Sequence, residues 1–219
     1  MRQVKVKICG ITCEEDLNMV CSMGADAVGF VVGVPSSLRN LTVEKAKKLI
    51  KLVQLFVKSV LVVVLCGEVE VLNLYESLKP DIIQIHGEKP FDAVFFKEKL
   101  PSATLVRAVR LKSEDSLSVA LQESRFFGAV PADSSFPKKC GGTGLTRDWC
   151  ISKRVRESIY PKPLILAGGL NPENVQEAVK TVKPYAVDVS TGVELKPGFK
   201  NLEKVAAFIT NAKAALIED

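Results

Sequence analysis

Histidine is almost missing from this sequence: His86 is the only one among 219 residues. A single histidine excludes most histidine-rich zinc sites and leaves at most one Ser-His-Asp arrangement. Aromatic residues make up only 6% of the chain and are not interleaved with its basic residues, as a platform for single-stranded nucleic acid requires. We therefore expect no metal site and no nucleic-acid partner, although the net charge is +5.

Long hydrophobic runs are also missing. The longest, from Val60 to Cys66, is far shorter than the roughly 20 residues that a membrane helix needs. No apolar signal segment precedes Val4. The six cysteines contain no CxxC pair, which favours reduced thiols over a disulfide framework. These absences predict a cytoplasmic protein without a membrane partner, and they leave its oligomeric state open.

What the sequence does contain is an alternation of short β-branched runs with amphipathic stretches, and 47% of its residues are hydrophobic. The runs expected to form strands covered by helices are 4–9, 27–32, 59–65, 81–86, 104–111, 129–133, 163–167 and 186–190. The patterns expected to form helices are 14–23, 43–55, 69–78, 115–124, 172–181 and 202–216. In the helix at 172–181, Asn171 is the expected N-cap and Pro172 the first helical residue.

Such a run of strand–helix units fits two architectures, an open doubly wound sheet and a closed eight-stranded barrel. A Rossmann sheet would carry a GxGxxG motif after its first strand, but here that strand ends in Cys9-Gly10-Ile11-Thr12. The glycine-rich segments come late in the chain, as in barrels that hold a phosphate after strands seven and eight. The sequence therefore predicts an α/β fold, a single (β/α)8 TIM barrel that spans residues 1–219.

Polar side chains gather where the strands of this barrel would end. Side chains alternate along a strand, and the apolar set should face the helices. The polar residues that this alternation turns inward near the carboxyl ends of four strands are Cys9, Gln84, His86, Asp133 and Asp188. Each alone is weak evidence, because a buried cysteine usually packs and a lone aspartate often caps a turn. Their convergence from four strands predicts a site.

Glycine-rich turns follow the last three expected strands. Glycine lets backbone N–H groups approach phosphate oxygens, although an isolated glycine pair can also serve a tight loop with positive φ. Because two of these turns fall where barrels hold phosphate, we expect a phosphorylated substrate. The expected phosphate-binding residues are Gly142, Gly144, Gly168, Gly169, Ser190, Thr191 and Gly192.

Five segments together resemble the phosphoribosylanthranilate isomerase family. They are KICGIT at 7–12, QIHG at 84–87, Asp133 with the GGTG at 141–144, LAGGLNPENV at 166–175 and VDVSTGVE at 187–194. The resemblance follows the order of the chain from residue 7 to residue 198. It implies a cofactor-independent aldose–ketose isomerase of tryptophan biosynthesis. The implied reaction is the Amadori rearrangement of N-(5-phosphoribosyl)anthranilate to 1-(2-carboxyphenylamino)-1-deoxyribulose 5-phosphate.

The resemblance also implies roles for single residues. Asp133 would be the acid that protonates the ring oxygen and opens the sugar, and Cys9 the base that takes the C2′ proton. Neither a metal nor an organic cofactor is expected, because the iminium itself is the electron sink. Arg39, in the segment Ser37-Leu38-Arg39, would bind the anthranilate carboxylate with its planar fork. The other residues implied to bind substrate are Gln84, His86 and Asp188.

These roles require shifted pKa values. The pKa of Asp133 must rise from about 3.9, and that of Cys9 must fall from about 8.5 in a positive field. Lys7 points into the barrel below Cys9, but we hypothesise that it pairs with Asp188, which would weaken that field. The residues Val130-Pro131-Ala132 replace the plain apolar run that the family carries before its acid, and this departure bears on the placing of Asp133.

Three alternatives remain open. An indoleglycerol phosphate synthase should carry an amino-terminal extension and lysine–glutamate catalysis, whereas the first strand here is expected at about residue 4. A barrel that only binds a phosphosugar would need neither Cys9 nor Asp133. Activity on the related histidine-pathway substrate would need a second phosphate site near strands two to four, where no glycine-rich loop occurs.

Overall fold

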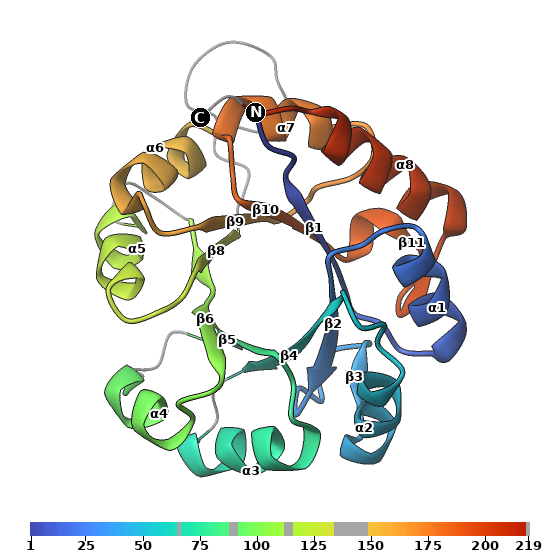
Figure 1. The fold of residues 1–219 in the computed structure, drawn as a ribbon, viewed down its shortest axis with the longest axis vertical. Helices are drawn as coiled ribbons and strands as arrows, with labels where there is room; N and C mark the ends of the chain where they lie inside the picture. Colours follow the sequence, from blue (N-terminus) through green and yellow to red (C-terminus); the bar gives the residue numbers. More distant parts are fainter. Residues whose placement is uncertain (65–66, 88–91, 112–115, 134–148, 218–219) are drawn as a thin grey trace.

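The computed structural model describes residues 1–64, 67–87, 92–111, 116–133 and 149–217, in which strands and helices alternate (Figure 1). The strands that correspond to predicted ones are β1 (Lys5–Cys9), β2 (Ala27–Val32), β4 (Lys58–Val64), β5 (Ile82–His86), β6 (Thr104–Arg107), β7 (Val109–Arg110), β8 (Val130–Asp133), β9 (Leu164–Ala167) and β10 (Ala186–Val189). The helices are α1 (Glu14–Ser22), α2 (Val43–Lys51), α3 (Glu68–Leu78), α4 (Ala93–Lys99), α5 (Ser116–Ser124), α6 (Cys150–Ile159), α7 (Val175–Val182) and α8 (Leu202–Ala214). Short elements that were not predicted are β3 (Asn40–Leu41), η1 (Thr191–Val193), β11 (Glu194–Lys196) and β12 (Phe199–Lys200).

The main sheet is parallel and closes on itself. Its strand order is β6-β5-β4-β2-β1-β10-β9-β8-β7, and the two outer members, β6 and β7, belong to one stretch of chain, 104–110. The predicted fifth strand is interrupted at Ala108, whose backbone N–H donates to the Ile85 carbonyl at 2.9 Å. The helices form a ring outside the strands (Figure 1). The predicted TIM barrel is therefore confirmed.

The start of α7 differs from its prediction by three residues, since the helix begins at Val175 and not at Pro172. Asn171 still accepts the backbone N–H of Asn174 at 2.9 Å, and the Asn174 side chain accepts the backbone N–H of Asn171 at 2.9 Å. This reciprocal pair resembles a capping box, but it holds a turn at 172–174 instead of the first helical turn. The helices α4 and α6 had no predicted counterpart.

The hydrophobic core lies between the barrel strands and the surrounding helices. Phe30, Phe96, Phe127 and Phe208 are almost completely buried there, and each stabilises the fold by about 1.5–3 kcal/mol relative to an exposed side chain. Inside the barrel, β1, β5 and β10 contribute the buried polar side chains Lys7, Gln84 and Asp188 beside a small apolar cluster of valines from β2 and β4. Among the described residues, no helix has both the length and the apolar character needed to cross a membrane.

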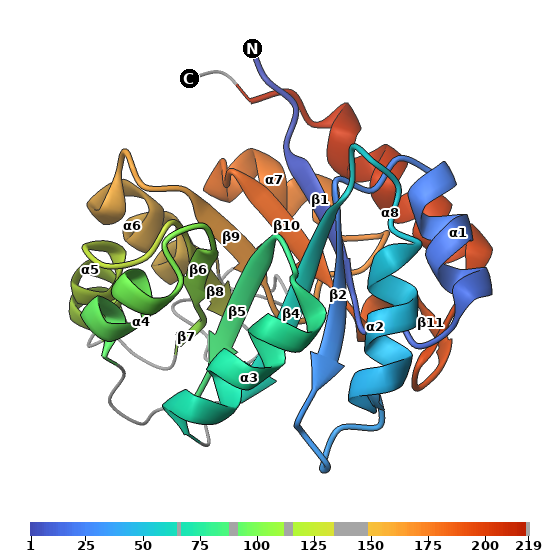
Figure 2. The ribbon, with the colours of Figure 1, turned by 60° about the horizontal axis from the view of Figure 1, so that its bottom comes forward.

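The two ends of the described chain are paired. The backbone N–H of Arg2 donates to the Ile217 carbonyl at 3.0 Å, and the N–H of Ile217 donates to the Arg2 carbonyl at 3.0 Å. Figure 2 shows both termini leaving the barrel on one side. Because Arg2 precedes β1, this pairing lies beyond the amino ends of the strands, opposite the barrel mouth.

Candidate active site

A cavity of about 260 Å³ opens at the carboxyl ends of the strands. It is lined by all five polar residues that the strand alternation predicted to converge: Cys9, Gln84, His86, Asp133 and Asp188. The lining also includes four of the expected phosphate-binding residues: Gly168, Gly169, Ser190 and Thr191. The structure therefore brings the predicted acid, the predicted base and two glycine-rich turns to one cavity.

A polar chain crosses the barrel interior beneath this cavity. Lys7 of β1 donates to Asp188 of β10 at 2.6 Å and to Gln84 of β5 at 2.9 Å. These three side chains are nearly inaccessible to solvent. Gln84 continues the chain, because its Nε2 lies 2.9 Å from Nε2 of His86. The hypothesis that Lys7 pairs with Asp188 is confirmed, and the register explains it, since the two residues face each other on adjacent strands.

The thiol of Cys9 lies in a field different from the one expected. Burial raises the pKa of Cys9, and the charges of Lys7 and Lys200, which oppose this effect, do not overcome it. The carboxylate of Asp188 also raises the pKa and cancels part of the Lys7 charge. The expected lowering of the Cys9 pKa is thus wrong, and Cys9 is a neutral thiol at neutral pH.

Gly29 of β2 makes room for this thiol, and sequence reasoning missed it. A Cβ atom at Gly29 would lie 2.8 Å from Sγ of Cys9 and 3.2 Å from Cε of Lys7. The available signal was a glycine inside an otherwise apolar strand, which often marks a close approach by another group. Gly29 allows Lys7 and Cys9 to occupy the barrel interior together.

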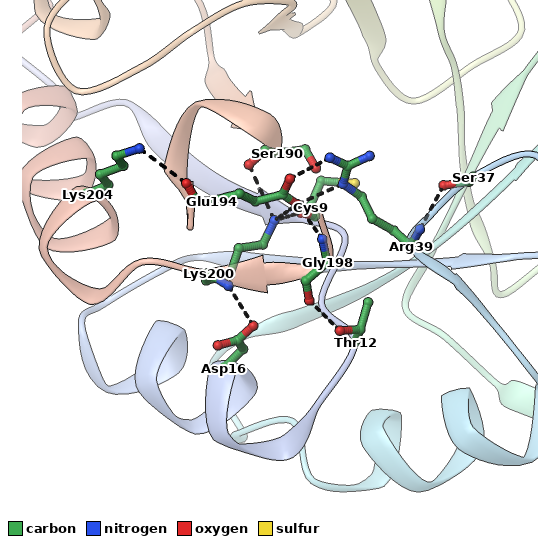
Figure 3. Close-up of polar contacts among 10 residues, drawn as sticks. All are labelled: Cys9, Thr12, Asp16, Ser37, Arg39, Ser190, Glu194, Gly198, Lys200 and Lys204. Carbon is green, nitrogen blue, oxygen red and sulfur yellow. Dashed lines mark hydrogen bonds and ion pairs between the residues drawn. The ribbon is translucent and has the colours of Figure 1, made fainter. Parts of the chain in front are cut away.

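Beside the cavity lies a cluster of buried charges (Figure 3). Nε of Arg39 donates to Glu194 at 2.7 Å, and a second nitrogen of the same guanidinium contacts the other carboxylate oxygen. Lys200, whose side chain is 0% exposed, donates to Glu194 at 3.0 Å and to the Cys9 carbonyl at 2.6 Å. Burial alone would raise the pKa of Glu194, but Arg39 and Lys200 hold it below its ordinary value.

This cluster limits the carboxylate-binding role that the resemblance implied for Arg39. One edge of its planar fork is occupied by Glu194, and Arg39 is not among the residues that line the cavity. Neither Glu194 nor Lys200 was predicted as a site residue. Lys200 lies in β12, the second strand of a short hairpin beyond the last barrel strand, and nothing in the local sequence indicated that its ammonium group would reach Cys9.

The two turns expected to bind phosphate lie on neighbouring strands. Gly168 and Gly169 follow β9 with φ values of +89° and +61°, a region that favours glycine. Ser190 and Thr191 follow β10, which pairs with β9. Oγ of Ser190 is buried and has no hydrogen-bond partner among the described residues.

The other glycines predicted to bind phosphate are Gly192, Gly142 and Gly144. Gly192 does not line the cavity, and its missing side chain serves packing, because a Cβ there would lie 1.9 Å from the Leu170 carbonyl oxygen. Gly142 and Gly144 lie outside the described residues.

A closed (β/α)8 barrel with a cysteine, an aspartate and glycine-rich turns at its mouth defines an enzyme of the acid–base TIM-barrel class. The family model described as N-(5'phosphoribosyl)anthranilate (PRA) isomerase matches residues 6–211. The chain belongs to this family and is an isomerase of tryptophan biosynthesis that converts an aldose to a ketose.

Sequence relatives and solved structures agree with this assignment. The N-(5'-phosphoribosyl)anthranilate isomerase of Methanothrix thermoacetophila is 40% identical over 211 residues, which cover 96% of this chain and 98% of that protein. The isomerase of Methanocaldococcus jannaschii is 40% identical over 218 residues, 94% of this chain and 95% of the relative. The crystal structure of the isomerase from Thermotoga maritima superposes with a TM-score of 0.84 at 35% identity, over 96% of this chain and 99% of that one.

Proposed function

We propose that this chain converts N-(5-phosphoribosyl)anthranilate into 1-(2-carboxyphenylamino)-1-deoxyribulose 5-phosphate, with Asp133 as the acid and Cys9 as the base. The observation that carries the proposal is that these two residues, from β8 and β1, line one cavity together with the turns after β9 and β10. A solved phosphoribosyl anthranilate isomerase in complex with reduced 1-(o-carboxyphenylamino)-1-deoxyribulose 5-phosphate superposes with a TM-score of 0.82 at 35% identity, over 96% of this chain and 99% of that chain. This likeness supports a phosphosugar as the small-molecule substrate.

Asp133 acts first. Its proton goes to the furanose ring oxygen, the C1′–O bond breaks, and the nitrogen lone pair forms a C1′=N iminium. The carboxyl group stands at the end of β8, on the rim of the cavity, where a sugar ring can reach it. A positioned acid of this kind contributes about 10²–10⁴-fold to a rate.

Cys9 acts second, on the open-chain iminium. The base removes the C2′ proton, the C–H electrons form the C1′=C2′ bond, and the iminium charge is neutralised in the enolamine. The enolamine then becomes the ketone by gaining a proton at C1′ and losing the proton of the 2′-hydroxyl. Since Cys9 is a neutral thiol, we propose that the positive iminium beside it favours loss of the thiol proton to solvent once the ring has opened, which leaves the thiolate as the base.

Two further contacts hold the ends of the substrate. Gly168, Gly169, Ser190 and Thr191 bind the phosphate, and the unpartnered Ser190 hydroxyl supports this assignment. Arg39 binds the anthranilate carboxylate through the part of its guanidinium that Glu194 does not occupy. Gly142 and Gly144 also bind the phosphate. Asp188, whose Oδ1 has no hydrogen-bond partner among the described residues, contacts the sugar.

The enzyme works in the cytoplasm, without a nucleic-acid or membrane partner. Among the described residues, Cys9, Cys13 and Cys21 are free thiols, which supports a reducing compartment.

A coupled assay tests the activity and both roles. The substrate is unstable, so it is made in the cuvette from anthranilate and phosphoribosyl pyrophosphate, and its fluorescence is followed after the protein is added. The wild-type protein should remove the signal rapidly, and Cys9→Ala and Asp133→Asn should each slow this by about 10²–10⁴-fold. Cys150→Ala, which removes an exposed thiol on α6, serves as the matched control and should keep full activity.

Each outcome has a definite meaning. If folded wild-type protein leaves the decay unchanged, the substrate is wrong and other phosphosugars should be tried. If the signal still disappears rapidly with both variants, the activity stands and the two residue roles are wrong.

A further inference from the structure

The hydrogen bonds of the polar chain beneath the cavity have a fixed donor-to-acceptor order, which is set by Lys7. The ammonium group carries only hydrogen-bond donors. It lies 2.6 Å from Oδ2 of Asp188. Burial lowers the pKa of Lys7, but the carboxylate of Asp188 and Cys9 more than offset this, and its pKa lies above the ordinary value. Lys7 is therefore charged and can only donate.

Because Lys7 can only donate, it determines which of the two flipped orientations the Gln84 side-chain amide adopts. The amide presents one accepting oxygen and one donating nitrogen, and turning it over would exchange them. The atom 2.9 Å from the Lys7 ammonium must accept, so it is Oε1. Nε2 of Gln84 is therefore the atom that faces His86, and it can only donate.

The state of His86 follows from the same reasoning. Nε2 of His86, which lies 2.9 Å from the Gln84 amide nitrogen, must accept a hydrogen bond and so carries no proton. A neutral imidazole with a bare Nε2 has its proton on Nδ1. His86 lines the cavity, and Nδ1 has no hydrogen-bond partner in the part of the chain that the structure describes.

We propose that Lys7 and Gln84 are positioning residues that hold His86 as a neutral imidazole with its proton on Nδ1, and that this Nδ1–H donates a hydrogen bond to a sugar oxygen of the substrate. His86 would then orient the substrate and would not carry a proton during the reaction. The substrate contact rests on the proposed function, whereas the tautomer does not.

The charges around His86 agree with a neutral ring. Burial, reinforced by the nearby charge of Lys7, lowers the pKa of His86 to about 4. Asp188 and Asp133 act in the opposite direction, and Arg110 also lowers the pKa. Even when both carboxyl groups are ionised, they do not outweigh the burial and the cations, so the ring stays neutral through the range in which an ordinary histidine titrates, near pH 6.5.

Because His86 is the only histidine, nitrogen NMR of the full chain labelled with ¹⁵N-histidine reports on one imidazole. At pH 7 we expect a protonated Nδ1, a bare Nε2, and no change in these shifts between about pH 5.5 and 8. A spectrum with the proton on Nε2, or with both nitrogens protonated, would overturn the proposal. This measurement needs neither substrate nor variant.

Gln84→Glu tests the cause of the tautomer. A carboxylate at this place accepts from His86, so the proton should move to Nε2 or the ring should become cationic. Gln122→Glu makes the same charge change at an exposed position on α5 and should leave the spectrum unchanged. A wild-type tautomer that survives in folded Gln84→Glu would show that Gln84 does not set it.

The substrate contact is tested by kinetics. His86→Asn keeps an N–H close to the place of Nδ1 and should retain most of kcat/KM, whereas His86→Leu should lose about ten-fold. The pH profile of His86→Asn should match that of wild type, because the ring carries no proton in the reaction. An equal loss in both variants, or a limb of the pH profile that disappears with His86, would remove the donor role and leave the tautomer and the isomerase activity untouched.

Discussion

Lys7 carries a positive charge inside the barrel, and this charge compensates the buried carboxylate of Asp188. Both Lys7 and Asp188 are less than 10% exposed, so the loss of one would leave the other buried and unpaired. Lys7→Met should therefore lower the free energy of unfolding by about 3–5 kcal/mol, measured by urea denaturation.

Lys5, on the same strand, offers the matched control. Its ion pair with Asp26 lies at the surface, where the Lys5 side chain is 55% exposed, so Lys5→Met should cost only about 0–1 kcal/mol. Equal losses in Lys7→Met and Lys5→Met would contradict the view that burial makes the difference.

His86 should make the stability of the protein sensitive to acid. The unfolded chain binds a proton at His86 below about pH 6.5, whereas the folded protein does so only near pH 4. Acid therefore favours unfolding across this interval, by up to about 3 kcal/mol at its lower end. In His86→Asn this component is absent, so chemical denaturation of the two proteins from pH 7 to pH 4 should show the wild type losing more stability.

At the residue scale, sequence reasoning succeeded where the information was local. The period of two along a strand turned Cys9, Gln84 and Asp188 to the same side, and the structure places them together. The contact between Arg39 and Glu194 joins residues 155 positions apart, and no local pattern encodes it. The pKa of Cys9 could not be predicted either, because it depends on a balance between burial and several charges.

At the scale of elements, β2 is shaped to accept side chains from β1. Gly29→Ala would place a methyl group 2.8 Å from Sγ of Cys9, so the thiol must move. We expect a loss of about ten-fold or more in kcat/KM and a loss of stability of about 1–3 kcal/mol, measured by the coupled assay and by urea denaturation.

Gly67→Ala is a suitable comparison for Gly29→Ala, because the nearest atom to a Cβ there lies 3.9 Å away. It should leave kcat/KM unchanged. If Gly29→Ala also keeps full activity, the space beside Cys9 is not needed for catalysis.

Element boundaries were predictable where hydrophobic periodicity changes sharply. The predicted strand at 27–32 has the same bounds as β2, and α2 begins at Val43 as expected, after Thr42, which caps it by accepting from Lys45. The start of α7 was misplaced because asparagine side chains can satisfy backbone donors in a turn as well as in a helix. The interruption between β6 and β7 arises from barrel closure, which the local sequence does not record.

At the scale of the whole molecule, Lys200 connects the last part of the barrel to the first strand. Its buried ammonium group bonds the Cys9 carbonyl, 191 positions away, and the carboxylate of Glu194. Lys200→Met should lower the free energy of unfolding by about 3 kcal/mol and also reduce kcat/KM, because the end of β1 carries the base.

Lys204→Met removes an exposed lysine whose ammonium group donates to the Glu194 backbone carbonyl at 3.2 Å, and it should change neither quantity measurably. A Lys200→Met protein as stable and active as wild type would show that the bond from Lys200 to Cys9 contributes neither to stability nor to catalysis.

The pairing of Arg2 with Ile217 bears on the order in which the barrel's strands must follow one another along the chain. These two residues, close to the two ends of the described chain, are hydrogen-bonded to each other on the side away from the catalytic mouth. A short linker could therefore join them, and the chain could be cut open at an exposed loop on that same side without disturbing the ring of strands. The barrel should tolerate such circular permutation, because each strand of the closed sheet keeps its two neighbours whichever strand comes first in the chain.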